Sequence, residues 1–559
     1  MLNDIIRKHA LKNRKQYGST NPKSIIGKVI ADFPEAKADM GKTMQDAARI
    51  CGEVNALDDA ALEAELSEYT FEEKKQEEKG LELPNAQEGK VITRFPPEPS
   101  GYPHVGHAKA IFLNREVANA YKGKMLLRFD DTNPEKEKPE YVDAIKDGFA
   151  WLGVKWDGEE TYTSDCMEDF YSYAKKLIEA GKAYVCDCSS ENVKKSRETG
   201  VACACRSLSA EENLQRWEGM LGSKYGAGEA ILRYKLDLQA ENTAMRDPTL
   251  FRIMLFAHYR QGERYRVWPS YDFAAPIMDS TEGVTHAMRT KEYELRNPLY
   301  FAVLEDLGLR KPELIEYARL AIKNAPISKR YITPLVKEGK VGGWDDPRLP
   351  TLRGLRRRGI LPEAIKNFVL SFGISKVESE PGWEKLLNEN RKLLDKEANH
   401  YFFVPNPVKL VVEGAESREV ELKLHPQKEG VRKYRVGETF FVPGNELEGM
   451  QEGEVFRLKD LYNVEVTSKG EGEARAKYAG DELTKGKKLQ WVSEPNECEV
   501  LKVGDLLKDG KYNPESLVAE KGYCEKAVLE LKKGTLIQFE RYGFCRLDSL
   551  EPLRFIYTC

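Results

Sequence analysis

The sequence of 559 residues lacks several features that would assign a broad class at once. No run approaches the roughly 20 apolar residues that a membrane-spanning helix needs. Residues 1–8 do not show the charged, apolar and cleavage segments of a secretory signal, so none is expected. There is no repeat at a fixed period, no low-complexity tract and no Gly-Lys-Ser/Thr phosphate-binding loop. The sequence therefore predicts a soluble protein.

Cysteine is sparse and unevenly distributed. Four of the ten cysteines lie within residues 186–205, and the other six are single. This is a poor framework for disulfides and suits a reducing cytoplasm. The formal net charge of -4 gives no general sign of nucleic-acid binding, so any RNA contact must come from local patches. A chain of this length is expected to fold into about three to five domains.

Hydrophobic patterning changes twice along the chain. In the first 88 residues apolar side chains recur at near-helical spacing, and a charge-rich run at 71–80 is typical of a solvated linker. A strand (91–95), a helix after Gly106 and a second strand (125–129) then follow in order, which is the βαβ unit of a parallel nucleotide-binding sheet. From residue 401 onward, short strands between Gly- and Pro-containing turns indicate β-barrels or sandwiches.

The strongest local signal is the segment Glu98-Pro-Ser-Gly-Tyr-Pro-His104-Val-Gly106-His107, which follows the first strand. Gly106 lets a ligand approach the backbone, and the following helix N-terminus offers free N–H groups to phosphate. Two of only seven histidines lie here, and their imidazoles are suited to donate hydrogen bonds to ATP phosphates. Taken alone, the segment could also be a surface loop that happens to contain histidines.

Two signatures carry a resemblance to a known family. His104-Val-Gly-His107 resembles the HIGH signature of the class I aminoacyl-tRNA synthetases, and Ala325-Pro-Ile-Ser328-Lys329-Arg330 resembles their KMSKS signature. Val105 and Ile327 depart from these signatures but remain apolar. Segments 93–102, 127–134 and 345–358 narrow the resemblance to the glutamyl and glutaminyl enzymes, from about residue 91 to the C-terminus.

The resemblance implies that an amino acid is activated with ATP, which brings Mg²⁺, and is then transferred to tRNA. It assigns catalysis to His104, His107 and Lys329. It assigns ATP contacts to His104, Gly106, His107, Arg319, Ser328 and Lys329. It assigns glutamate contacts to Arg94, Glu98, Asp130, Tyr271 and Arg289. The carboxylates suit the ammonium group of the substrate and Arg94 suits a carboxylate, although Asp130 is alternatively a metal ligand. The family further implies that tRNA binds before glutamate is activated.

Arg289 decides between glutamate and glutamine. Within Gly283-Val-Thr-His-Ala-Met-Arg289, glutaminyl enzymes carry a cysteine where glutamyl enzymes carry this arginine. A guanidinium binds a carboxylate through two hydrogen bonds, whereas an amide would leave the buried charge unpaired. Such a mismatch discriminates against glutamine by about 10⁴-fold, so glutamate is predicted as the substrate. The alternative is a surface arginine in a turn.

Arginines near the middle of the chain indicate RNA contact. Arg353, Arg356, Arg357 and Arg358 are expected to meet tRNA phosphates, with a solvated helix face as the alternative. The combination of Arg289 with C-terminal barrels resembles archaeal-type glutamyl-tRNA synthetases. The sequence leaves open whether tRNA(Gln) is charged as well as tRNA(Glu), and a monomer is favoured.

Two Cys-x-Cys pairs form a further constellation. Cys186 and Cys188 are separated by fourteen residues from Cys203 and Cys205, and four thiolates can close a tetrahedral Zn²⁺ site. Such a site would be structural because no coordination position stays open. Four free thiols are the alternative.

We therefore predict a multidomain α/β plus all-β fold with a doubly wound, Rossmann-like catalytic domain. The predicted parts are a helical accessory domain (1–88), the first half of the catalytic domain (89–189), an inserted acceptor-stem domain (190–285), the second half of the catalytic domain (286–340), a helical stem-contact region (341–400) and two anticodon-binding barrels (401–559). The predicted reaction is ATP-dependent ligation of glutamate to tRNA. The alternatives are a glutaminyl enzyme, a catalytically silent tRNA-binding relative and a small-molecule adenylyltransferase.

Overall fold

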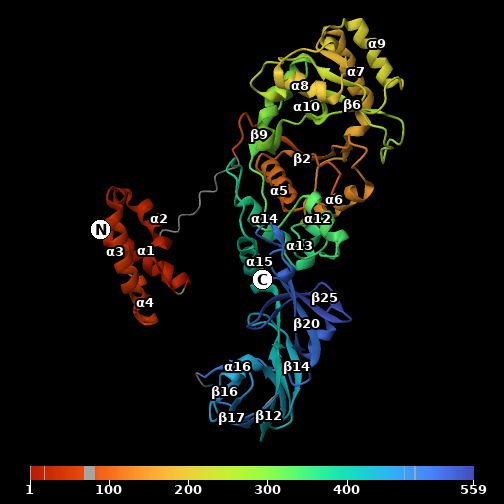
Figure 1. Ribbon diagram of the computed structural model, residues 1–559. Coiled ribbons are helices and arrows are strands. Elements are labelled where there is room, and N and C mark those ends of the chain that lie inside the picture. The colour runs from red at the N-terminus through yellow and green to blue at the C-terminus, as the bar shows by residue number, and fades with distance from the viewer. Residues whose placement is uncertain (1, 18, 68, 70–81, 471, 484–485) are drawn as a thin grey trace. The chain divides into compact units, whose positions relative to one another are not determined.

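The computed structural model describes residues 2–17, 19–67, 69, 82–470, 472–483 and 486–559. Two compact units, Met1–Gly80 and Leu81–Cys559, are considered separately (Figure 1). The predicted linker at 71–80 lies outside the described residues. Within the described ranges, no helix is both long and apolar enough to cross a membrane.

The N-terminal unit is built from helices. They are α1 (Leu2–Tyr17), α2 (Pro22–Asp32), α3 (Met40–Asn55) and α4 (Asp59–Ser67), with the 3₁₀ turn η1 (Pro34–Asp39) before α3. The Asn21 side chain caps α2 by accepting the Ser24 N–H, and Asp39 caps α3 by accepting the Lys42 N–H. The apolar faces of these helices meet in a core that includes Ile6, Leu11, Val29, Ile50 and Val54.

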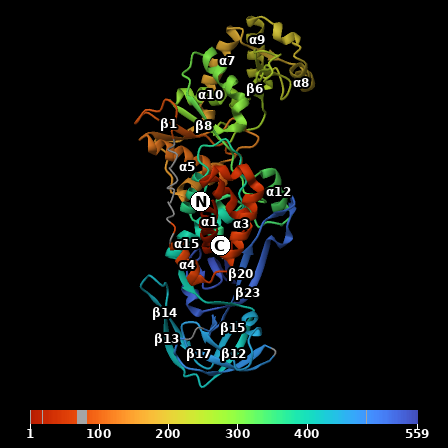
Figure 2. The same ribbon diagram turned by 90° about the vertical axis from the view of Figure 1, so that its left-hand side faces the viewer.

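The larger unit begins with a parallel sheet. Its strands are β1 (Ile92–Phe95), β2 (Lys124–Phe129), β3 (Thr161–Tyr162), β8 (His286–Thr290) and β9 (Glu313–Tyr317). β1 pairs with β2, β2 with β3 and β8 with β9, all parallel. The Thr285 N–H donates to the Ile92 carbonyl, so β8 lies beside β1 (Figure 2). The spatial order of the strands is β3-β2-β1-β8-β9. From β1 the chain first adds β2 and β3 on one side and later adds β8 and β9 on the other, so a switch point lies at the carboxyl ends of β1 and β8.

Helices cover this sheet and connect its strands. They are α5 (Val105–Ala120), α6 (Pro139–Leu152), α7 (Met167–Glu179), α10 (Tyr271–Thr281) and α11 (Asn297–Asp306). α5 and α6 pack with β1 and β2 in one apolar cluster, whereas α7, α10 and α11 pack in another. The βαβ unit expected from the sequence is present as β1, α5 and β2.

A small antiparallel sheet lies between β3 and α10 in the sequence. Its strands, in order, are β4 (Ala183–Cys186), β5 (Ile231–Tyr234), β6 (Thr249–Ile253) and β7 (Val267–Pro269). The connection from β4 to β5 contains α8 (Ser190–Thr199), the 3₁₀ turn η3 (Ala204–Ser207) and α9 (Ala210–Leu221). β4 begins before residue 190, where the inserted domain was expected to start, and β7 ends well before residue 285, where it was expected to end. The next helix, α10, packs beside α11 of the parallel sheet.

Helices join the parallel sheet to the C-terminal strands. They are α12 (Lys329–Lys337), α13 (Leu352–Arg358), α14 (Pro362–Leu370) and α15 (Trp383–Glu397). α14 packs against α5 and α15, and α13 contacts the strands β25 (Gly543–Leu550) and β26 (Leu553–Tyr557).

Two nearly closed β-barrels form the C-terminal part. One sheet has the order β15-β12-β18-β17-β16-β19 and the other β10-β24-β25-β26-β20-β23-β11. Phe441 of β15 exchanges backbone hydrogen bonds with Val492, just beyond β19, which brings the ends of the first sheet together. The strands of both sheets are β10 (Asn399–Tyr401), β11 (Phe403–Pro405), β12 (Pro407–Glu413), β15 (Thr439–Pro443), β16 (Val455–Leu458), β17 (Asn463–Lys469), β18 (Glu473–Tyr478), β19 (Lys488–Leu489), β20 (Asn496–Val503), β23 (Leu517–Cys524), β24 (Leu536–Phe539), β25 (Gly543–Leu550) and β26 (Leu553–Tyr557). Two-stranded ribbons, β13 (Arg418–Lys423) with β14 (Val431–Val436) and β21 (Leu507–Lys508) with β22 (Lys511–Tyr512), complete the region.

The segment 401–404 serves both barrels. Tyr401 and Phe403 enter one core, whereas Phe402 and Val404 enter the other, as the two-residue period of an extended chain requires. The expectation of barrels after residue 401 is therefore confirmed.

Candidate active site

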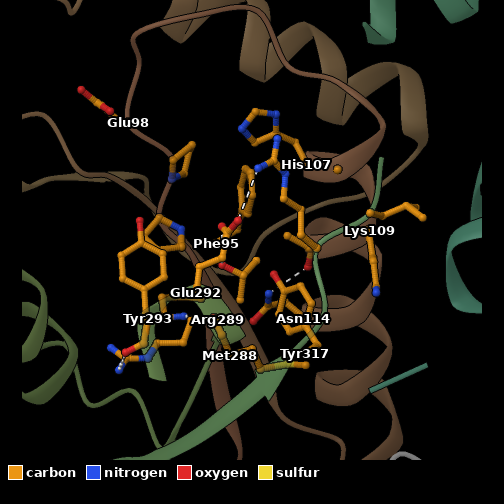
Figure 3. A pocket seen from close by; sticks show the side chains of 18 of the residues that line it. Phe95, Glu98, His107, Lys109, Asn114, Met288, Arg289, Glu292, Tyr293 and Tyr317 are labelled. Atoms are coloured by element: carbon orange, nitrogen blue, oxygen red, sulfur yellow. Dashed lines mark hydrogen bonds and ion pairs between the residues drawn. The ribbon is translucent and has the colours of Figure 1, made fainter. Parts of the chain in front are cut away.

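A cavity of about 310 Å³ opens at the switch point of the parallel sheet (Figure 3). Phe95 at the end of β1 and Met288 and Arg289 in β8 contribute to its wall. The predicted residues in its lining are Arg94, Glu98, His104, Gly106, His107, Tyr271, Arg289 and Arg319. The fold thus gathers eight of the expected site residues, which lie far apart in the sequence, around one hollow.

The two histidines at the start of α5 are locked in a defined orientation. The His104 Nδ1 accepts the Gly106 N–H at 3.1 Å, and the His107 Nδ1 accepts the His104 N–H at 3.1 Å. Burial, followed by the charges of His107 and Arg319, lowers the pKa of His104 well below its usual value, and burial lowers the pKa of His107 to about 4. Both imidazoles are therefore neutral at pH 7, and each must carry its proton on Nε2 because Nδ1 is an acceptor. The site offers two Nε2–H donors beside a helix N-terminus.

Arg289 has unfilled hydrogen-bonding capacity. Its side chain is buried, and one nitrogen, Nη2, donates to the Tyr293 carbonyl and to the Asn297 Oδ1. Nε and Nη1 have no partner among the described residues. The unpaired Nε–H and Nη1–H donors point to different edges of the guanidinium, so each can donate to a separate acceptor, and the buried positive charge is available to a carboxylate.

Arg94 lines the same cavity but is already neutralised. Its Nε and Nη2 donate to the two Asp279 oxygens, at 2.9 and 3.1 Å, and Nη1 donates to the Met288 carbonyl at 2.7 Å. Arg94 therefore connects β8 and α10 at the cavity wall. Because its donors are occupied, it is not free to bind a substrate carboxylate, which is the role predicted from the sequence.

Other predicted residues lie at the edge or wall of the cavity. Glu98 is exposed and lies apart from the central cluster in Figure 3. The Tyr271 ring packs against Tyr293, with 4.8 Å between centroids, and burial raises the pKa of its hydroxyl. Arg319 forms an ion pair of 3.3 Å with Glu292, and both are about half exposed.

Three predicted residues lie outside the lining of this cavity. The Asp130 Oδ1 accepts hydrogen bonds from the Arg128 Nε at 2.7 Å and from the Thr163 hydroxyl at 2.9 Å. Ser328 precedes α12, and the Lys329 Nζ donates to the Tyr141 hydroxyl at 2.9 Å and to the Ser100 carbonyl at 3.3 Å. Lys329 is thereby tied to the loop between β1 and α5.

Lys109 is a site residue that the sequence reasoning missed. It lies two residues after His107, lines the cavity and is buried. Its Nζ donates to the Ala318 carbonyl at 2.7 Å, and burial lowers the pKa of this amine to about 8. The sequence does contain a signal for Lys109, because a lysine stands there among the apolar residues of a helix that is predicted to pack on the sheet.

The four arginines of the predicted RNA patch divide into two groups. Arg356 is exposed and Arg353 partly buried beside Asp147, and Arg357 is held by Asp548 at 2.9 Å. Arg358 is only 3% exposed and packs over the Trp383 ring. Its prediction as a phosphate ligand is wrong, because the helix end that carries it packs against the C-terminal strands.

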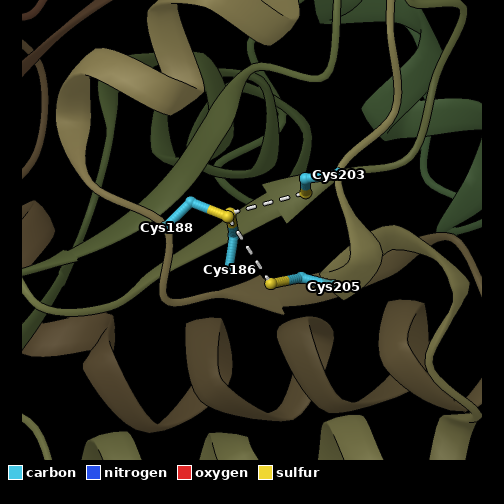
Figure 4. A group of neighbouring side chains, drawn as sticks. All are labelled: Cys186, Cys188, Cys203 and Cys205. Carbon is cyan, nitrogen blue, oxygen red and sulfur yellow. Dashed lines mark hydrogen bonds between the residues drawn. The ribbon is translucent and has the colours of Figure 1, made fainter.

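The four clustered cysteines converge in space (Figure 4). All four sulfur atoms lie within 4.8 Å of one another. Cys186 and Cys203 have an Sγ–Sγ distance of 3.9 Å, and Cys188 and Cys205 one of 3.8 Å. A tetrahedral Zn²⁺ with Zn–S bonds of ~2.3 Å places its sulfur ligands about 3.8 Å apart, so this arrangement fits zinc.

A doubly wound sheet with a histidine-lined cavity at its switch point defines a nucleotide-binding catalytic domain. Comparison with known proteins makes the class specific. The family model for the catalytic domain of class I tRNA synthetases (E and Q) matches residues 90–396, and two models for their anti-codon binding domains match 398–479 and 488–548. The chain belongs to this family.

Curated relatives match nearly the whole chain. The glutamate–tRNA ligase of Nitrosopumilus maritimus is 44% identical over 99% of this chain and 98% of its own length. Those of Korarchaeum cryptofilum and Pyrococcus furiosus are each 40% identical, covering 99% and 97% of this chain and the same shares of their own lengths.

Proposed function

We propose that this chain is a glutamate–tRNA ligase that forms glutamyl-adenylate from glutamate and ATP and transfers glutamate to the terminal adenosine of tRNA(Glu). The observation that carries the choice of amino acid is the pair of unpartnered nitrogens on buried Arg289. A side-chain carboxylate accepts a hydrogen bond from this guanidinium and neutralises its charge, whereas a glutamine amide supplies one oxygen and no charge. Burial makes the mismatch costly, because an unpaired charge would remain.

The ammonium and carboxylate groups of glutamate require further partners. Tyr271 supplies a wall and a hydroxyl, and Glu98 at the rim attracts the ammonium group. Asp130 would reach that group only by exchanging its contact with Thr163 or Arg128. Arg94 does not bind the substrate directly, since its donors are occupied by Asp279 and Met288, and it instead holds β8 in place.

Residues at the start of α5 are placed to bind the phosphates of ATP. The α-carboxylate of glutamate attacks the α-phosphate of ATP, and pyrophosphate leaves. His104 and His107 donate Nε2–H bonds to phosphate oxygens as charge develops, whereas the first backbone N–H groups of α5 are already bound by the Pro350 carbonyl and by the His104 side chain and carbonyl. Arg319 and Lys329 neutralise the leaving pyrophosphate, and Lys329 must first release Ser100 and Tyr141. ATP enters with Mg²⁺, as phosphate substrates usually do.

The tRNA ligand spans the remaining domains. A ribose hydroxyl of its terminal adenosine attacks the adenylate, after which AMP leaves. The antiparallel sheet β4–β7 is suited to hold the acceptor stem, Arg353, Arg356 and Arg357 its phosphates, and the barrels the anticodon. We place this reaction in the cytoplasm, together with the tRNA pool.

We also propose a structural Zn²⁺ held by Cys186, Cys188, Cys203 and Cys205. The metal would fix the long connection between β4 and β5. It takes no part in the chemistry, because four thiolates leave no open coordination position.

The test is charging of purified tRNA(Glu) and tRNA(Gln) with labelled glutamate and, separately, labelled glutamine. Glutamate on tRNA(Glu) supports the proposal, and glutamate on both tRNAs extends it to tRNA(Gln). Glutamine as the preferred amino acid would overturn it, and pyrophosphate exchange absent under all conditions would favour a silent tRNA-binding protein.

A further inference from the structure

Arg233 is a buried arginine without a counter-charge. Its side chain is 0% exposed, and its Nε donates to the Asp247 backbone carbonyl at 3.0 Å. In the part of the chain that the structure describes, neither Nη1 nor Nη2 has a hydrogen-bond partner, and no carboxylate pairs with this guanidinium. Burying an uncompensated charge is costly, so an anion is expected nearby.

The four cysteines lie on the same side of the small sheet as Arg233. β4 and β5 are antiparallel, with Cys186 opposite Ile231 and Tyr184 opposite Arg233. Positions two apart along a strand face the same side, so Arg233 and Cys186 are diagonal neighbours, about 7–8 Å apart at the backbone. The Arg233 guanidinium packs over the Tyr184 ring, with 5.5 Å between the guanidinium carbon and the ring centroid.

Two other arginines of this region are paired with carboxylates, whereas Arg197 and Arg246 donate to backbone carbonyls and have no ion pair in the part of the chain that the structure describes. Arg206 binds the Asp247 carboxylate at 2.7 Å, and Arg216 binds Asp187 at 3.0 Å. These pairs cancel internally, and among the arginines left without a carboxylate Arg233 is the one that is fully buried beside Cys186. Zn²⁺ with four thiolates carries a net charge of -2, which supplies the missing anion.

We propose that Arg233 is the buried counter-charge of a four-thiolate metal centre and favours metal binding without ligating the metal. The inference rests on the zinc assignment made above and extends it to a positioning residue. Partners outside the ligand set typically change metal affinity by about 10- to 100-fold when removed, and a similar loss is expected here.

The experiment uses the full chain, stripped with a chelator and titrated with Zn²⁺ in competition with a chromophoric chelator. Arg233→Met should bind zinc about 10- to 100-fold more weakly than the wild type, and Arg233→Lys should recover part of the loss. Arg266→Met is the matched control, because Arg266 also has an unpartnered Nε but bonds only the Tyr225 carbonyl. It should bind zinc as the wild type does. Substitution with Co²⁺ provides thiolate-to-metal absorption bands as a second readout.

Thermal unfolding separates charge compensation from simple packing. If Arg233 serves the metal centre, Arg233→Met should shrink the increase in Tm caused by zinc without lowering the Tm of the zinc-free chain. An equal loss of Tm with and without zinc, or an unchanged zinc affinity, would overturn the inference. A wild-type chain that binds no zinc would overturn the zinc assignment as well, while leaving the tRNA-charging test of the proposed function untouched.

Discussion

The Arg94 guanidinium, which lines the cavity, and the Asp279 carboxylate form a bidentate ion pair, with N–O distances of 2.9 and 3.1 Å. The same carboxylate accepts the Arg128 Nη1 at 3.0 Å and the Tyr300 hydroxyl at 2.9 Å. Burial alone would raise the pKa of Asp279, but the charges of Arg94 and Arg128 lower it to about 2. One carboxylate thus connects β1, β2, α10 and α11.

Asp279→Asn should strongly destabilise the catalytic domain. The change leaves the buried Arg94 guanidinium without its counter-charge, whereas Arg128 keeps Asp130 and Glu282, and breaking a buried pair costs about 3–5 kcal/mol. Urea unfolding measures this loss. Asp272→Asn is a control on the same helix, because Asp272 pairs with the half-exposed Arg296 and should cost no more than ~1 kcal/mol. Equal losses for the two variants would contradict the argument.

The histidine pair should give an unusual pH profile. Burial lowers the pKa of His107 to about 4 and lowers that of His104 well below its usual value, so neither imidazole titrates in the ordinary histidine range. We expect tRNA-dependent pyrophosphate exchange to show no loss with an apparent pKa near 6.5. His107→Ala should lower kcat by about 10²–10³-fold, since a preorganised donor is lost. A rate that falls as pH rises through the ordinary histidine range would indicate catalysis by imidazolium instead.

Arg289→Met should remove recognition of the substrate carboxylate. The kcat/KM for glutamate is expected to fall by about 10⁴-fold, because the carboxylate would be buried without a partner. Lys291→Met removes a nearby positive charge, but Lys291 pairs with the exposed Glu378. Steady-state charging should distinguish the two variants. Similar losses in both would mean that general electrostatics, rather than Arg289 geometry, selects the amino acid.

Sequence reasoning found the parts of this site that are encoded locally. The β1–loop–α5 unit and the histidine pair lie in one continuous segment, and the spacing of apolar residues predicts its fold. Arg289 could be placed because it sits in a short recognisable segment at the end of a strand. These features depend little on distant parts of the chain.

The remaining features depend on tertiary contacts. Asp279 is unremarkable in the sequence, and only the packing of α10 brings it to Arg94. Lys109 became a cavity residue because β9 ends beside α5. Arg358 was expected at the surface from its basic neighbours, yet the C-terminal strands cover it. Pairing between segments hundreds of residues apart is not encoded in local spacing.

The arginines of α13 should separate by their salt dependence. Arg356 is exposed, so Arg356→Ala should weaken tRNA binding and reduce the slope of log K against log salt by about 1, as loss of one phosphate contact requires. Arg358 is buried, its Nε and Nη1 lack partners among the described residues, and burial lowers its pKa to about 10. Arg358→Met should therefore change the unfolding free energy but leave the salt slope unaltered, because no phosphate is reached. Filter binding across a salt series measures the slope, and urea unfolding measures stability. A reduced slope for Arg358→Met would place that guanidinium on the RNA and restore the expectation drawn from the sequence.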